Sequence, residues 1–219
     1  MGLDAGIGGI WAGLALCLVL AGCDGVVVAP VSEPSSPAAP RRIGVSNRAV
    51  VISGPEGYCI DKAAARDGAA GAFVLLGSCA ALAQSAAAGQ PVVPAVLTAS
   101  VSPPGAQPVA AQLPVLNSYF LSAEGRAALS RSGRAQSVTV AQAWGSGGVF
   151  YLVAQDSSPS GSQRLQTTFW RAVFDAKGRI VTLNVAGLKT QPLSPEAGRA
   201  TLEAFVRQVQ RENRAGPGG

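Results

Sequence analysis

Residues 167–187 read TTFWRAVFDAKGRIVTLNVAG, and this stretch decides the fold class. Two runs rich in aromatic and β-branched residues flank the segment Asp175-Ala-Lys-Gly178, a pattern typical of a β-hairpin. Gly178 supplies the positive φ that such a turn needs. The two runs, 167–175 and 179–187, are therefore predicted to pair as an antiparallel hairpin, the element with the clearest signal in the domain.

Segments upstream of the hairpin carry strand patterns of the same kind. The predicted strands are residues 49–53, 72–76, 92–101, 137–144 and 149–155. Pro94 lies inside the third, and proline cannot donate a ladder hydrogen bond, so we expect that strand at an edge or a bulge. Between the strands we expect an Ala-rich helical turn at 80–88, loops at 103–114 and 155–164, and a helix over 122–131 capped by Ser122.

The last predicted element is a helix that begins after Ser194, a good N-cap, with Pro195 at its first position. Its apolar positions recur at helical spacing: Leu202, Phe205, Val206 and Val209. We expect this stripe to pack on the protein's own sheet rather than on a partner. The fold class is therefore α+β, an antiparallel sheet with one or two covering helices. The order of elements resembles a PsbP/Mog1-like sandwich, a fold analogy that implies no function.

Composition excludes several classes of protein. The 219 residues contain no histidine, and the only methionine is Met1. Without histidine the chain cannot build a Ser-His-Asp or Cys-His nucleophile system, and it lacks the commonest ligand of zinc and copper. We expect no cofactor and no metal. The net charge is +5, but the basic residues are scattered, and we expect no nucleic-acid partner.

The N-terminus carries an export pattern. Residues 10–20, IWAGLALCLVL, are uncharged but too few to span a bilayer, as in the apolar region of a signal peptide. Leu20-Ala21-Gly22-Cys23 follows directly and resembles the lipobox of bacterial lipoproteins. The resemblance implies that residues 1–22 are removed by signal peptidase II between Gly22 and Cys23. It also implies that Cys23 carries diacylglycerol and palmitate. A plain signal peptide or a short uncleaved anchor is the alternative.

The chain after the predicted cleavage site falls into three predicted segments. Residues 23–42 are rich in Pro, Ser and Ala and are expected to form a lipidated tether. A single α+β domain is predicted over 43–213, with a disordered tail at 214–219. The expected location is the periplasmic face of the cell envelope. Asp24 after the lipidated cysteine favours the inner membrane, with the outer membrane as the alternative.

Two cysteines remain in the folded part, Cys59 and Cys79. An even pair in an oxidising compartment favours a disulfide. The alternative is a reactive thiol at Cys59 whose pKa is lowered by Lys62.

Acidic residues are densest at Glu56, Asp61 and Asp67. Such carboxylates can act as acid and base or bind a hard cation, but their spacing matches no calcium loop, and a solvated loop is favoured. The segments GYCID (57–61), RD (66–67) and AFVLLGSC (72–79) weakly resemble a group of envelope lipoproteins, and the resemblance implies no activity.

The sequence favours a non-enzymatic binding or assembly-support module, held on the membrane by the lipid on Cys23 and facing an envelope protein. The first alternative is an atypical enzyme that uses Asp61, Asp67 and Lys62. The second is a passive envelope component. The aromatic residues Trp144, Tyr151, Phe169, Trp170 and Phe174 lie on predicted strands, and packing in the core is the favoured interpretation. The alternative is an aromatic binding platform formed by Tyr151 and Trp170, which requires that they face outward on adjacent strands.

Overall fold

The computed structural model describes residues 39–159 and 164–214. These residues belong to one compact unit, residues 35–219. Both hydrophobic cores described below, and the disulfide, are formed by side chains of this unit alone. The predicted signal peptide, lipobox and C-terminal tail from residue 215 lie outside the described residues, as does the tether except for its last few residues.

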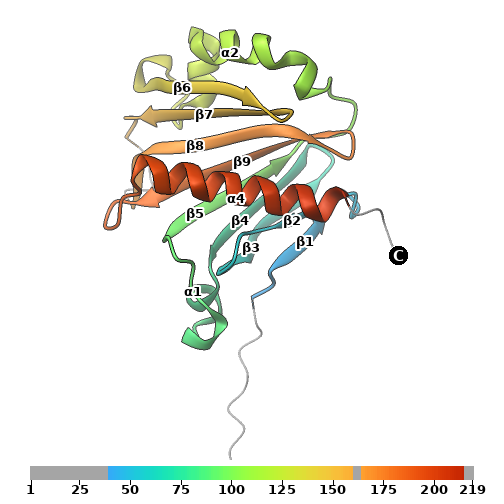
Figure 1. Cartoon of the computed structure of the whole chain (residues 1–219), viewed down its shortest axis with the longest axis vertical. Coiled ribbons are helices and arrows are strands. Elements are labelled where there is room, and N and C mark those ends of the chain that lie inside the picture. Colours follow the sequence, from blue (N-terminus) through green and yellow to red (C-terminus); the bar gives the residue numbers. More distant parts are fainter. Residues whose placement is uncertain (1–38, 160–163, 215–219) are drawn as a thin grey trace, which may run out of the picture. The chain divides into compact units, whose positions relative to one another are not determined.

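The fold is α+β, as predicted, and is built on a seven-stranded antiparallel sheet of order β3-β4-β5-β9-β8-β7-β6 (Figure 1). Its strands are β3 (Tyr58–Gly68), β4 (Gly71–Ser78), β5 (Ala95–Val101), β6 (Val138–Ser146), β7 (Val149–Asp156), β8 (Leu165–Ala176) and β9 (Arg179–Leu188). A second sheet pairs β1 (Arg42–Val45) with β2 (Val50–Ser53). The helices are α1 (Cys79–Ala83), α2 (Leu113–Leu121), α3 (Ala123–Leu129) and α4 (Pro195–Arg214), with short 3-10 turns at Ala86–Ala88, Val109–Gln112 and Ala135–Ser137.

The hairpin of β8 and β9 turns over two residues. Ala176 pairs with Arg179, and Lys177 and Gly178 between them have φ of 52° and 69°. Two left-handed residues in a two-residue loop match the right-handed twist of the flanking strands. The predicted hairpin is confirmed, and it brings β5 and β7 to its two sides.

Helix α4 covers one face of the large sheet (Figure 1). Ser194 caps it, since its Oγ accepts a hydrogen bond from the backbone N–H of Ala197 at 3.2 Å. The predicted stripe is buried, with no member more than 2% exposed: Leu202, Phe205, Val206 and Val209. It packs against side chains from β4, β5, β8 and β9 and from the small sheet, which confirms that the stripe belongs to the core.

The opposite face of the sheet is covered unevenly. α2, α3 and the turn at Val109–Gln112 pack over β6, β7 and β8 in a second core around Phe120, Phe150 and Leu152. On β4, β5 and β9 the residues that face this side are half-buried, whereas their neighbours facing α4 are buried. Part of this face is therefore open to solvent.

Three local predictions were wrong. Strand β5 begins after Pro94 and lies between β4 and β9, because a proline before the strand costs no ladder bond. Residues 58–68, predicted as an acidic loop, form the edge strand β3. The predicted loop at 103–114 contains the start of α2, where Pro114 lies in the first turn that tolerates proline.

Candidate functional site

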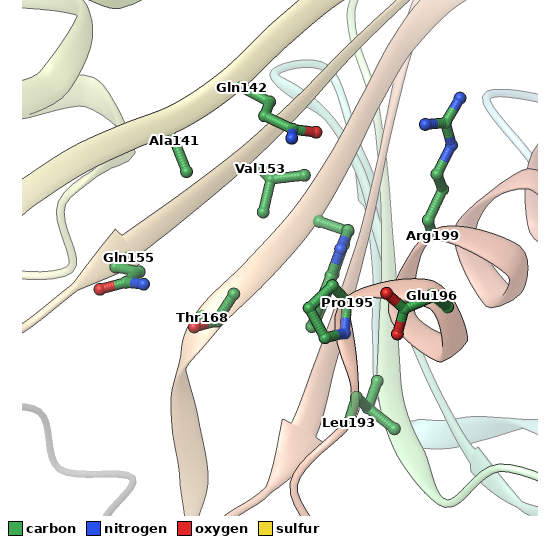
Figure 2. Close-up of a pocket in the computed structure, with 10 residues that line it drawn as sticks. Ala141, Gln142, Val153, Gln155, Thr168, Leu193, Pro195, Glu196 and Arg199 are labelled. Carbon is green, nitrogen blue, oxygen red and sulfur yellow. The ribbon is translucent and has the colours of Figure 1, made fainter.

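A groove lies between the first turn of α4 and the outer strands of the sheet. Its volume is about 490 Å³, and Figure 2 shows residues of three strands on one side and residues around the start of the helix on the other. The lining residues are Ala141, Gln142, Val153, Gln155, Thr168, Trp170, Leu193, Pro195, Glu196 and Arg199.

A β-bulge at Ala141 orients the β6 residues of this groove. Val140 pairs with Ala154, but Gln142 pairs with Val153, so β6 contains one extra residue. An extra residue reverses which side chains face each side of a strand. After the bulge Ala143 packs into the core under α2 and α3, which leaves Gln142 to face the groove beside Val153.

Cross-strand rows form the floor of the groove. Gln142, Val153 and Trp170 are neighbours on β6, β7 and β8, and Gln155 is paired with Thr168 in the next row. Gln142 and Gln155 are exposed, and Thr168 is half-buried. The groove therefore presents two neutral amides and a hydroxyl, each able to donate and to accept hydrogen bonds, around an apolar centre.

An aromatic and cationic stack continues beside the groove. Trp144 of β6 and Tyr151 of β7 are directly paired, and their rings stack with centroids 5.2 Å apart and planes 12° apart. The Arg199 guanidinium of α4 lies 4.8 Å from the centroid of Trp144. Its Nε also donates to Oε1 of Glu203 at 2.9 Å. These contacts place the cation beside the groove, where its side chain is 55% exposed.

Trp170 belongs to the core, as the strand alternation favoured, and the alternative of an aromatic platform with Tyr151 is not realised. The Trp170 side chain is 2% exposed and lies under α4, because Gly198 lets the helix backbone approach the indole closely. A Cβ at Gly198 would lie 2.3 Å from Cε2 of Trp170. The partly exposed aromatic pair is Trp144 with Tyr151. Trp144 faces this side only because of the bulge in β6, and strict alternation along the sequence does not reveal a bulge.

The acidic residues proposed for catalysis lie on β3, at the opposite edge of the sheet from β6. Asp61 Oδ1 accepts hydrogen bonds from the backbone N–H groups of Ala63 and Ala64, at 2.9 and 3.2 Å, within the bulge of β3. Asp67 Oδ2 accepts from the Ser46 N–H at 2.8 Å. The two carboxylates thus have separate backbone partners, and Lys62 is exposed.

The predicted disulfide is present. Cys59 of β3 and Cys79 at the start of α1 are joined, and both are buried. The bridge links the edge strand β3 to the chain that follows its neighbour β4.

Asp156, at the end of β7, is a buried carboxylate that sequence reasoning missed. Its side chain accepts hydrogen bonds from the Ser158 hydroxyl at 2.6 Å, the Ser158 N–H at 2.9 Å and the Arg131 N–H at 2.8 Å. Burial alone would raise the pKa of Asp156, but these hydrogen bonds outweigh it and lower the pKa to about 2. The carboxylate thereby links the chain that follows α3 to the end of β7. It was missed because its sequence context, Asp156-Ser157-Ser158, resembles that of an ordinary turn.

The chain matches no known protein family, no curated protein and no solved structure. Within residues 39–159 and 164–214, no three acidic or cysteine side chains lie close enough together to hold a metal ion. In the same part of the chain, no helix has the length and apolar character to cross a membrane.

Proposed function

We propose that this protein is a lipid-anchored component of the bacterial envelope whose folded unit binds a partner protein without catalysing a reaction. The partner contributes an extended peptide segment, which lies in the groove between α4 and strands β6 to β8. The lipobox at residues 20–23 supports the anchor, and the groove supports the binding.

The observation that carries the proposal is the groove's chemistry. Gln142, Gln155 and Thr168 offer donors and acceptors that match peptide N–H and C=O groups, and the apolar surface of Val153 lies between them. Charge of both signs enters through Arg199, which lies over Trp144, and through the Glu196 carboxylate. A mainly apolar site with a few positioned polar groups is typical of ligand recognition.

The position of the groove also suits an extended peptide. β6 is the last strand of the sheet, and no other described strand pairs with its outer side. A sheet edge beside a lined groove lets a peptide combine backbone hydrogen bonds with side-chain contacts.

The anchor is tested by feeding cells a clickable palmitate analogue. We expect the wild-type chain to be labelled and the Cys23→Ala variant to lose the label and leave the membrane fraction. Equal labelling of the two chains would remove the anchor from the proposal.

The binding site is tested by placing a photo-crosslinking amino acid at Gln142 in the native host. Gln136, also exposed but outside the groove, is the matched control. We expect a discrete adduct with an envelope protein from position 142 and not from 136. If position 142 gave no adduct, or both positions gave the same adducts, the groove would not be the binding site.

A further inference from the structure

A different site lies on the other sheet face, at the border between its covered and open parts, where Arg171 of β8 lies between Leu152 of β7 and Asn184 of β9. Its Nε donates to Oδ1 of Asn184 at 2.6 Å, and Nδ2 of Asn184 donates to Oγ1 of Thr98 at 3.1 Å. These three residues form one cross-strand row over β8, β9 and β5. The guanidinium also lies 5.5 Å from the centroid of the Phe169 ring. The cation is thus held in place by neutral groups.

Arg171 forms no ion pair with any residue of the described part. Its one side-chain hydrogen bond within that part is made by Nε. No fully buried side-chain nitrogen there lacks a partner, so the two terminal nitrogens of Arg171 are not completely enclosed, although burial of the guanidinium lowers its pKa to about 10. The two terminal nitrogens therefore have no acceptor among the described residues, which leaves them for an acceptor from outside.

Apolar side chains continue from Arg171 across the open face. Leu75 is paired with Thr98 in the same row, and Val96 lies in the row beside it. Farther along this face, Phe73 and Ile180 line a hollow of about 580 Å³ together with Arg66, Ser100 and Thr182. Apart from the exposed Arg66, these strand residues are half-buried, whereas residues at the same level facing α4 are buried.

We propose that this face binds an amphipathic monocarboxylate, with the carboxylate on Arg171 and the apolar chain over Leu75, Phe73 and Val96. A carboxylate matches the planar fork of a guanidinium and accepts two of its hydrogen bonds. A buried or half-buried charge without a counter-ion is costly, so a bound anion recovers part of that cost. An apolar chain then removes the adjoining hydrophobic surface from water. A ligand with only one of these two parts leaves half of the site unused.

The test is calorimetric titration of residues 35–219, which contain both cores, with dodecanoate kept below its micelle concentration. Dodecanol has the same chain without the charge, and acetate has the charge without the chain. We expect dodecanoate to bind with one site per protein, and both other probes to bind at least about tenfold more weakly.

Arg171→Gln removes the cation and should weaken dodecanoate binding about tenfold or more. Arg134→Gln makes the same charge change at an exposed position on the loop before β6 and should leave binding unchanged. Leu75→Asp keeps Arg171 but places a negative charge on the apolar floor, so it should also weaken binding. Melting curves test whether each variant is folded. If Arg171→Gln does not fold, the affinity of Leu75→Asp for dodecanoate tests the proposal instead.

Failure to bind dodecanoate would overturn the proposal, as would a wild-type affinity in Arg171→Gln or, where that variant does not fold, in Leu75→Asp. Equal binding of dodecanol would also overturn it, because the guanidinium would then have no role. Gln142→Ala, in the groove on the other face, should leave dodecanoate binding unchanged. The outcome is therefore separate from that of the crosslinking experiment at the groove.

Discussion

Replacing Gly198 by alanine should destabilise the folded unit, although the same change stabilises an ordinary exposed helix. Alanine is favoured over glycine inside a helix by about 1 kcal/mol. At this position, however, the new Cβ would lie 2.3 Å from Cε2 and 2.4 Å from Cζ2 of Trp170. Carbon atoms in contact normally lie about 3.5–4.0 Å apart, so α4 and the indole must separate by more than about 1 Å.

The steric effect should exceed the helix preference. Overpacking a core costs about 1–3 kcal/mol, occasionally more, and a displacement of this size belongs at the upper end of that range. After subtracting the gain of about 1 kcal/mol in helix propensity, we expect a net loss of about 2 kcal/mol. Separation at this point would also open the floor of the groove, because Trp170 lines it.

Urea unfolding of residues 35–219, followed by circular dichroism, measures this loss. Ala200→Gly, at an exposed position two residues along α4, should cost about 1 kcal/mol through helix propensity alone. In a Trp170→Leu background the clash with the indole is relieved, so Gly198→Ala should no longer destabilise the protein and should show the helix-propensity gain of up to about 1 kcal/mol. A Gly198→Ala protein that is about 1 kcal/mol more stable than wild type would refute the close packing of α4 on Trp170.

Three further predictions concern the core, the disulfide and a buried carboxylate. Phe205→Ala should lower the free energy of unfolding by about 3–5 kcal/mol, while Arg207→Ala on the exposed side of α4 should change it by less than about 1 kcal/mol. If Phe205→Ala and the wild-type protein melted at the same temperature, the stripe would not be part of the core. Alkylation and mass spectrometry of freshly isolated protein should find Cys59 and Cys79 without free thiols, and two alkylated cysteines would contradict the bridge. The pKa of Asp156 is lower than its ordinary value of 3.8, so its carboxylate stabilises the fold above about pH 4, and this contribution is lost as the pH falls toward 2. Asp156→Asn should therefore cost about 2 kcal/mol at pH 7 and almost nothing near pH 2, and a pH-independent cost would contradict the hydrogen-bonded carboxylate.

Periodic and local signals made much of the fold predictable. The β8–β9 hairpin follows from two strand patterns and one glycine turn, and α4 follows from its cap and its apolar spacing. Strand β3 was missed because its second half is charged and exposed, as befits an edge strand. Helix α2 was not predicted because the prolines around it favour a loop.

The groove was less predictable than the fold, for reasons that lie in long-range geometry. The bulge at Ala141 adds one residue without any glycine or proline to mark it, and it decides that Gln142 and Trp144 face α4. The close approach at Gly198 depends on Trp170, which is 28 residues away in the sequence. Arg171 likewise acquires its partners, Asn184 and Thr98, only through strand pairing.

Filling the groove while monitoring the adduct from position 142 tests the binding claim most directly. Thr168→Trp places an indole in the groove opposite Gln155, whereas Thr190→Trp adds the same side chain at an exposed position after β9. With the photo-crosslinker at position 142 in the native host, we predict that Thr168→Trp abolishes the adduct and Thr190→Trp leaves it at the wild-type level. An undiminished adduct in a folded, membrane-bound Thr168→Trp protein would contradict a partner seated in the groove.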